Sequence, residues 1–186
     1  MRIIAGTAKG HAIFAPKGAR TRPTQDRVRE SIFNVIATWG LYDTRVLDLY
    51  AGTGAMAIEA LSRGAANAVA IDQATGRCIG ENAEHCRMAE RLTILPLSVK
   101  AGVKRLVSMA AEPFDYVFMD PPYGKGLILP TLQEIIRARL LKDQAYVIVE
   151  RGTTEQVLWP ESLALIKEKQ YRHSCVTYLQ YTSKGE

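Results

Sequence analysis

The pattern of hydrophobic and polar residues changes its character at about residue 45. Before that point, two short apolar segments, residues 2–5 and 11–14, flank a glycine-containing turn, and residues 23–38 carry an apolar stripe at helical spacing. The stripe consists of Val28, Ile32, Val35 and Ile36, and Arg27 and Arg29 fall outside it. The pattern predicts an N-terminal hairpin followed by one amphipathic helix.

Beyond residue 45, short apolar runs alternate with amphipathic segments. The runs predict strands at residues 45–50, 68–72, 92–97, 114–119 and 146–150. Helices are expected between them, and the last one is marked by Leu129, Leu132, Ile136 and Leu140, with Pro130 in its first turn. Two alternating segments close the chain, at residues 162–168 and 174–181, and they suit a pair of antiparallel strands.

This order of elements predicts an α/β fold. Alternating strands and helices with nearly continuous apolar strands form a mostly parallel sheet that helices cover on both faces. We expect a Rossmann-like sheet of seven strands with an antiparallel C-terminal pair and an N-terminal hairpin and helix as an extension. Ligands of such sheets bind beyond the carboxyl ends of the strands, where the strand order reverses.

Size and composition agree with one domain. The chain has 186 residues, of which 47% are hydrophobic and 23% charged. We expect a single domain over residues 1–186, with a basic arm and helix in residues 1–40 and the catalytic core in residues 41–186. No apolar run reaches the roughly 20 residues of a membrane span, and no secretory stretch opens the chain, so a cytoplasmic protein is expected, which we take to be monomeric.

The positive charge is concentrated at the N-terminus. Residues 1–30 hold seven basic and two acidic residues, and the remainder holds 17 of each, so the arm carries the whole net charge of +5. A basic arm on a neutral body favours a polyanionic partner such as RNA, although a solvated basic face is the alternative.

The turn after the first strand has the composition of a nucleoside-binding loop. Gly52 and Gly54 allow a sharp turn and a close approach of the backbone to a ligand. Asp72, at the end of the second strand, can accept hydrogen bonds from the ribose hydroxyls of an adenosine. This pattern also fits NAD. Asp48 favours S-adenosylmethionine (AdoMet) instead, because a carboxylate there would repel a pyrophosphate but hold the ammonium group of a methionine moiety. The expected cofactor-binding residues are Asp48, Tyr50, Gly52, Gly54, Asp72, Gln73 and, for the adenine, Ser98.

The fourth strand ends in Asp120-Pro121-Pro122-Tyr123, which is the most specific signal in the chain. The two prolines fix two φ angles and hold the turn rigid. The Asp120 carboxylate and the Pro121 carbonyl can both accept N–H bonds from a base amine, and they thereby aim a poor nucleophile at the methyl group. Tyr123 can stack on the base. We expect these four residues to be catalytic.

Two other chemistries are disfavoured. Methylation of a pyrimidine carbon needs a cysteine nucleophile, and none of Cys78, Cys86 and Cys175 is near this turn. The three histidines, His11, His85 and His173, form no ligand set in the sequence, so no metal is expected.

The sequence resembles the RsmD family of bacterial methyltransferases over essentially its whole length. The resemblance rests on Met1–Gly6, on the distinctive segment Arg22-Pro23-Thr24-Gln25-Asp26-Arg27-Val28-Arg29-Glu30-Ser31-Ile32-Phe33-Asn34, and on Asp48–Gly54, Glu59–Ala65 and Asp120–Tyr123. It implies AdoMet as methyl donor and the N2 amine of a guanine in 16S ribosomal RNA as acceptor, within the 30S subunit or an assembly intermediate.

The basic segment then becomes a candidate RNA contact. Its expected RNA-binding residues are Arg20, Arg22, Thr24, Arg27 and Arg29, which would grip phosphates and place the base over Tyr123.

Three alternatives stay open at this point. The first is methylation of another base amine, adenine N6 or cytosine N4, in RNA or DNA. The others are an RNA-binding protein without catalysis and an NAD-dependent oxidoreductase.

Overall fold

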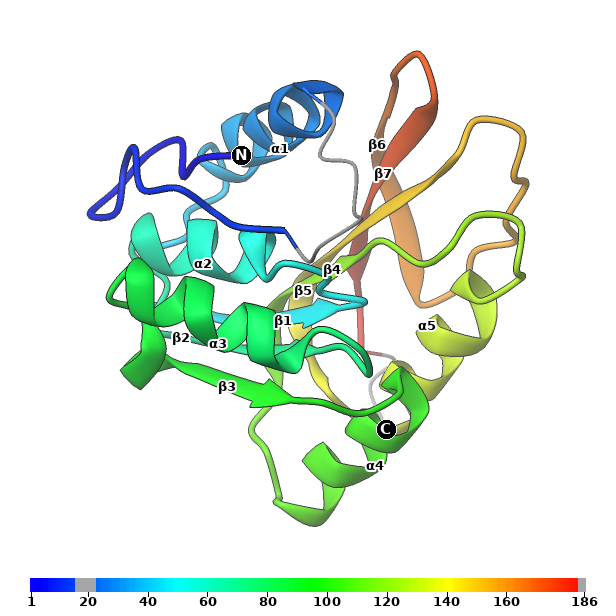
Figure 1. Ribbon diagram of the computed structural model, residues 1–186. Helices are drawn as coiled ribbons and strands as arrows, with labels where there is room; N and C mark the ends of the chain where they lie inside the picture. The colour runs from blue at the N-terminus through cyan, green and yellow to red at the C-terminus, as the bar shows by residue number, and fades with distance from the viewer. Residues whose placement is uncertain (16–22, 184–186) are drawn as a thin grey trace.

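Helices and strands alternate from residue 45 onward in the structure, a computed structural model that describes residues 1–15 and 23–183 (Figure 1). The helices are α1 (Pro23–Ile36), α2 (Ala55–Ser62), α3 (Gly76–His85), η1 (Ala89–Arg91, one 3₁₀ turn), α4 (Val99–Ser108) and α5 (Ile128–Arg137). The strands are β1 (Arg45–Leu49), β2 (Asn67–Ile71), β3 (Leu92–Leu95), β4 (Phe114–Met119), β5 (Leu141–Gly152), β6 (Leu163–Gln170) and β7 (Ser174–Tyr181).

The strands form one seven-stranded sheet with the order β3-β2-β1-β4-β5-β7-β6. The first five strands are parallel, and β7 lies antiparallel to both β5 and β6. This confirms the expected fold class, including the C-terminal pair. The order reverses between β1 and β4, so the carboxyl ends of these two strands open the crevice in which ligands of such sheets bind.

Alternate residues of the strands face two separate hydrophobic layers. Leu47 and Leu49 of β1 pack with the apolar faces of α4 and α5, whereas Val46 packs with α1, α2 and α3. Figure 1 shows α2 and α3 together on one side of the sheet, with α4 and α5 away from them. Because both faces are covered at β1, β2 and β4, these strands are apolar almost throughout, which is why the sequence predicted them well.

The N-terminal hairpin packs on α2. One antiparallel bridge joins Arg2 and Ala12, and the hairpin is otherwise a series of turns. The amides of Ile4 and Ala5 donate to the buried carboxylate of Glu59 on α2, at 2.8 and 3.1 Å. Gly6 lies so close to α2 that a Cβ would stand 1.8 Å from the carbonyl oxygen of Ser62. The hairpin is therefore fastened to the helix that follows the β1 loop.

Two helices differ from the sequence prediction. The buried residues of α5 are Ile128, Thr131, Leu132 and Ile135, so its inner face lies one position earlier than the predicted stripe, and Leu140 follows the helix. Helix α1 ends at Ile36, two residues before the predicted end, and buries Phe33 rather than Val35 completely. No helix in the described part of the chain has the length and apolar character to cross a membrane.

Candidate active site

The loop after β1 contains two glycines that serve different purposes. Both have positive φ, +56° at Gly52 and +74° at Gly54. A Cβ on Gly52 would have no atom closer than 4.0 Å, so the loop borders open space there. A Cβ on Gly54 would lie 2.8 Å from Cγ2 of Ile79, so Gly54 lets the loop pack against α3. The space beside Gly52 leaves room for a ligand, whereas Gly54 is required by the packing of the loop against α3.

Asp72 joins this loop to the loop after β2. Its Oδ2 accepts a hydrogen bond from the Gly52 amide at 3.0 Å, and its Oδ1 accepts from the amides of Ala74 and Thr75 at 2.9 and 3.1 Å. The carboxylate borders the larger cavity described below. Each carboxylate oxygen has two lone pairs, so these bonds leave acceptor capacity for a hydroxyl group.

Asp48 lies within β1 and is 3% exposed. Its Oδ2 accepts from the amide of Ala57 in the first turn of α2, at 3.1 Å. Burial raises its pKa to about 7, the Ala57 bond opposes that shift, and the charge of Asp72 adds to it. A cation that entered the adjoining cavity would favour the ionised form of this carboxyl group.

Tyr50 follows β1 with a φ of +61°, an unusual conformation for a residue other than glycine. Its hydroxyl group forms a 2.8 Å hydrogen bond with the hydroxyl of Thr131 on α5. The bond spans the crevice between β1 and α5. It fixes the Tyr50 ring as a wall of both cavities.

The turn after β4 meets this loop at the point where the strand order reverses. Asp48 pairs in register with Phe118 of β4, so Asp120 lies two positions further on and on the same face of the sheet as Asp48. Asp120, Pro122 and Tyr123 are exposed, with Asp120 on the wall of the cleft, whereas Pro121 is buried. Desolvation at the cleft wall raises the pKa of Asp120 to about 8, and the negative charges of Glu150 and Asp48 add to the shift.

Glu150 is a site residue that sequence reasoning missed. It lies near the end of β5 and next to Asp120, because Met119 and Val149 pair in register. The Tyr123 hydroxyl donates to Glu150 Oε1 at 3.0 Å. Burial and the charges of Asp120 and Glu150 raise the pKa of Tyr123, which keeps the hydroxyl group protonated. Glu150 could have been found in the sequence as a carboxylate near the end of an apolar strand, which is also the position of Asp48.

Two cavities meet at these residues and form one cleft. The larger has a volume of about 1010 Å³ and runs from the loop after β2 to the turn after β4. The smaller has about 230 Å³ and lies over the loop after β1, beside Asp48, Gly52 and Met1. Tyr50, Asp120 and Glu150 line both. The glycine loop and the Asp-Pro-Pro-Tyr turn therefore face the same space.

Two more of the expected cofactor-binding residues, Gln73 and the expected adenine contact Ser98, lie in the larger cavity. Gln73 and Ser98 are exposed and line it. Ser98 is also the N-cap of α4, where its hydroxyl accepts from the amide of Ala101 at 3.4 Å. Gln73 directly follows Asp72, so both polar side chains border the region beside the expected ribose contact.

The charges of the cleft favour a cationic ligand. Among the described residues that line the two cavities, the acidic side chains are those of Asp48, Asp72, Asp120, Glu134 and Glu150, and the basic ones are those of Arg29, Lys100 and His173. The sulfonium and ammonium groups of AdoMet suit such a cleft, whereas the pyrophosphate of NAD does not. Open space at Gly52 and a buried carboxyl group at Asp48 also fit AdoMet.

The environment of Arg29 contradicts the expectation that this residue binds RNA. It is 4% exposed, its Nε lies 3.7 Å from Glu59 Oε2, and it donates to the carbonyl oxygen of Arg2. It also forms an ion pair with Asp26 on its own helix at 3.2 Å. A side chain that is enclosed in this way cannot grip a phosphate. Its charge instead helps to compensate the buried Glu59, together with Arg63, whose Nε lies 2.7 Å from Glu59 Oε1.

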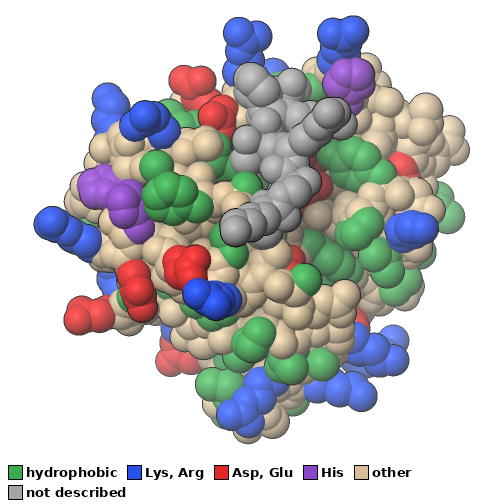
Figure 2. Space-filling model, in the orientation of Figure 1, with side chains coloured by type: hydrophobic (Ala, Val, Ile, Leu, Met, Phe, Trp, Pro, Cys, Tyr) green, Lys and Arg blue, Asp and Glu red, His purple; other side chains and the backbone are tan. Residues whose placement is uncertain are grey.

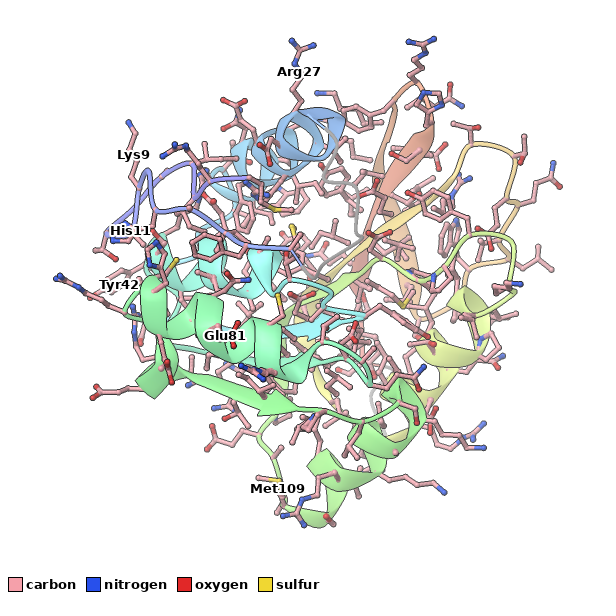
Figure 3. All side chains as sticks on the ribbon, in the orientation of Figure 1. Lys9, His11, Arg27, Tyr42, Glu81 and Met109 are labelled. Atoms are coloured by element: carbon pink, nitrogen blue, oxygen red, sulfur yellow. The ribbon has the colours of Figure 1, made fainter. Side chains whose placement is uncertain are left out.

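Arg27, two residues earlier on α1, is exposed. It extends from α1 away from the body of the molecule (Figure 3). It borders a polar groove of about 480 Å³ between α1 and β6, together with Lys167 and Lys169 of β6. Figure 2 shows Lys and Arg side chains standing out along the edge formed by α1 and the β6–β7 hairpin. Arg20, Arg22 and the side chain of Thr24 lie outside the described residues.

Comparison with known proteins gives one consistent family. The family described as "Conserved hypothetical protein 95" matches residues 1–180. The Ribosomal RNA small subunit methyltransferase D of Escherichia coli is 32% identical over all of this chain and 92% of its own length. The protein of the same name from Haemophilus influenzae is 29% identical over 91% of this chain and 88% of its own. The solved structure of yhhF from Escherichia coli superposes with a TM-score of 0.85 at 30% identity, over 99% of each chain.

Proposed function

We propose the function of this chain on the basis of its family. The chain belongs to the RsmD family of ribosomal RNA methyltransferases. As a member of that family it is an rRNA methyltransferase of the AdoMet-dependent kind. The finer proposal is that it methylates the exocyclic N2 amine of a guanine in 16S ribosomal RNA, on the 30S subunit or an assembly intermediate.

One observation carries this proposal. The glycine loop after β1 and the Asp-Pro-Pro-Tyr turn after β4 border the same cleft, and Asp120 lines both of its cavities. A nucleoside held on the β1 and β2 side can therefore meet a base amine held on the β4 side. The acidic character of the cleft supports a cationic methyl donor.

The residues of the cleft would divide the work between donor and acceptor. Asp48 and the Gly52 region would bind the methionine part of AdoMet, and Asp72, Gln73 and Ser98 the adenosine part. When bound, AdoMet supplies an electrophilic methyl group on a sulfonium sulfur, which keeps the electron pair of the broken C–S bond. Asp120 Oδ and the carbonyl oxygen of Pro121 would accept the two amine hydrogens and aim the nitrogen lone pair at that carbon. As the C–N bond forms, the surplus proton leaves the nitrogen through Asp120.

Tyr123 would hold the plane of the base. Its ring is 44% exposed, and its hydroxyl group is fixed by Glu150. A Cβ on Gly152 would lie 3.6 Å from the Tyr123 ring, so the ring rests against β5 on one side. A flipped base can stack on the open side.

We further propose that the RNA backbone follows the edge formed by α1 and β6. Arg27, Lys167 and Lys169 meet there, and Lys169 donates to the Ser31 hydroxyl at 2.7 Å, which joins the two elements. Phosphate contacts of this kind position an RNA without reading its sequence.

The experiment that tests the function uses labelled AdoMet and 30S particles that lack the modification. The purified protein is incubated with both, the ribosomal RNA is digested with nuclease, and the labelled nucleoside is identified by mass spectrometry. N2-methylguanosine at one position of 16S ribosomal RNA is the expected product. Label on adenine N6 or cytosine N4, or no label in the RNA, would contradict the proposal.

A further inference from the structure

The register of β4 and β5 places two carboxylates side by side at the acceptor end of the cleft. Met119, the last residue of β4, pairs with Val149 of the parallel strand β5, so Asp120 directly after β4 and Glu150 of β5 come next beside each other. Both line the large and the small cavity. Their closeness is also the reason why Glu150 raises the pKa of Asp120.

Glu150 is held in a fixed orientation. Its Oε1 accepts the Tyr123 hydroxyl at 3.0 Å, and Tyr123 is itself held beside Gly152 of the same strand. An ionised carboxylate accepts hydrogen bonds only and offers about four lone-pair positions, so the bond to Tyr123 leaves acceptor capacity toward the cavity. When Asp120 is ionised, as the reaction requires, the cleft presents two adjacent acceptors to a base that rests on Tyr123.

This pair of acceptors suits the edge of one nucleobase. Guanine carries two neighbouring donors, the N2 amine and N1–H. Adenine and cytosine have an amine beside a ring nitrogen that is an acceptor, and that nitrogen would set its lone pair against the second carboxylate. Two acceptors that face each other share no hydrogen atom, so neither regains the hydrogen bond that it gives up when water is excluded, and this costs binding free energy.

We propose that Glu150 accepts the N1–H of the target guanine while Asp120 accepts the N2 amine, so that Glu150 selects guanine over other amine-bearing bases. This inference rests on the proposed function, because it assumes that guanine N2 is the acceptor. It assigns Glu150 a place in base recognition in addition to its bond with Tyr123.

The test replaces the target guanosine by 2-aminopurine, which keeps the 2-amine but has an acceptor at N1. The two versions of 16S ribosomal RNA are made by ligation, assembled into 30S particles, and compared by the kcat/KM for methyl transfer. The wild-type protein is expected to favour guanosine by about 100-fold or more, since a site built around a substrate N–H strongly rejects an analogue without it. Glu150→Gln can donate to N1 of 2-aminopurine, so its preference is expected to shrink to about tenfold or less.

The matched control is Glu155→Gln. Glu155 Oε2 accepts from the amide of Gly124 in the same turn, at 3.4 Å, but Glu155 lines neither cavity. The preference of Glu155→Gln for guanosine over 2-aminopurine is expected to equal that of the wild type. Thermal melting and calorimetric binding of AdoMet monitor folding of both variants, and a merely structural role of Glu150 would leave the ratio of the two substrates unchanged.

The outcomes separate the two proposals. A wild-type protein that methylates guanosine and 2-aminopurine about equally overturns the role of Glu150, even if Glu150→Gln fails to fold. An unchanged preference in folded Glu150→Gln overturns it as well. Absence of methyl transfer to guanosine N2 by the wild type instead refutes the proposed function itself.

Discussion

Asp120 meets the substrate amine in the proposed reaction, so its removal should slow methyl transfer more than it weakens binding. Asp120→Asn keeps one acceptor oxygen but loses the negative charge that offsets the growing positive charge on nitrogen. We expect single-turnover methyl transfer to fall by about 100- to 1000-fold. Calorimetric affinity for AdoMet should change by less than about threefold. Asp143→Asn, at the exposed opposite end of β5, is the control. Equal losses of rate and AdoMet affinity in Asp120→Asn would contradict this assignment.

The raised pKa of Asp120 predicts how activity depends on pH. Desolvation at the cleft wall, with Glu150 and Asp48 nearby, raises the pKa of this carboxyl group to about 8, so the protonated form is favoured at neutral pH while no cation occupies the cleft. The reaction needs the ionised form. Values of kcat/KM should therefore rise with pH until about 8 and level off above it.

Asp120→Asn provides the control for this profile. The rise near pH 8 should disappear from its residual activity, while any dependence near pH 7 from Asp48, whose pKa burial also raises, should persist. A profile in the wild type that is flat from pH 6 to about 9 would show that the charge of Asp120 is not needed.

Arg29 and Arg27 lie two residues apart on α1 and should respond to substitution in opposite ways. Arg29 shares the buried Glu59 with Arg63, which lies closer, so Arg29→Met leaves the carboxylate one cation and should lower the free energy of unfolding by about 1 to 3 kcal/mol. Arg27→Met changes an exposed side chain and should leave stability within about 0.5 kcal/mol of the wild type. Urea denaturation measures both. Equal stability of the two variants would mean that the Arg29–Glu59 pair does not support the hairpin and α2.

At the scale of elements, the hydrophobic pattern predicted every strand of the described residues and the location of the cleft, but β5 begins at Leu141, five residues before the predicted start, because its first part is polar and exposed. The parallel strands are buried on both faces, so their apolar runs stand out from the helices between them. The stripe of α5 was placed one position late, because Leu129 and Ile136 are apolar yet only partly buried. Apolar character alone does not say which neighbouring position faces the sheet.

The site was partly predictable for a similar reason. Asp48 and Asp120 stand beside distinctive glycine and proline motifs, and these marked them in the sequence. Glu150 has no such motif, and only the register of β4 and β5 brings it to Asp120. Arg29 looked like a phosphate ligand because its partner Glu59 lies in α2, 30 positions away, and spacing along the chain does not reveal that contact.

The loop after β1 yields a prediction about the packing of two elements. Gly54→Ala would place a methyl group 2.8 Å from Cγ2 of Ile79 on α3, at a φ that already disfavours alanine. The variant should be clearly destabilised in urea, by about 2 kcal/mol or more. Ile79→Ala removes Cγ2, the atom that the new methyl group would meet. Adding Gly54→Ala to Ile79→Ala should therefore lower the free energy of unfolding by less than Gly54→Ala lowers that of the wild type.

Gly52→Ala is the matched control for that loop. Its Cβ would meet no atom closer than 4.0 Å, so only the positive φ opposes it, at a cost of about 1 kcal/mol. It should instead reduce the affinity for AdoMet, because the methyl group would enter the proposed cofactor space. If Gly54→Ala is as stable as Gly52→Ala, the close contact with Ile79 does not restrict which residue can stand at position 54.

At the scale of the whole molecule, the charges separate donor and acceptor. The cleft is acidic among its described residues, and basic side chains stand at the edge that α1 and β6 form (Figure 2). An RNA backbone would be attracted to that edge and repelled by the cleft itself. This arrangement favours entry of a single flipped base into the cleft, while the backbone stays outside.

The basic edge should therefore govern RNA binding without affecting the cofactor. Arg27→Ala/Lys167→Ala removes two charges beside the groove between α1 and β6. We expect weaker binding to 30S particles and a smaller slope of log K against log salt concentration, by about 1.5 for two lost phosphate contacts. Lys104→Ala, an exposed charge on α4 away from this edge, should change neither quantity (Figure 1). Filter binding between about 50 and 200 mM salt measures the slope, and calorimetry should give the same AdoMet affinity for all variants. A double variant that binds 30S particles with the wild-type slope would show that the RNA backbone follows another surface.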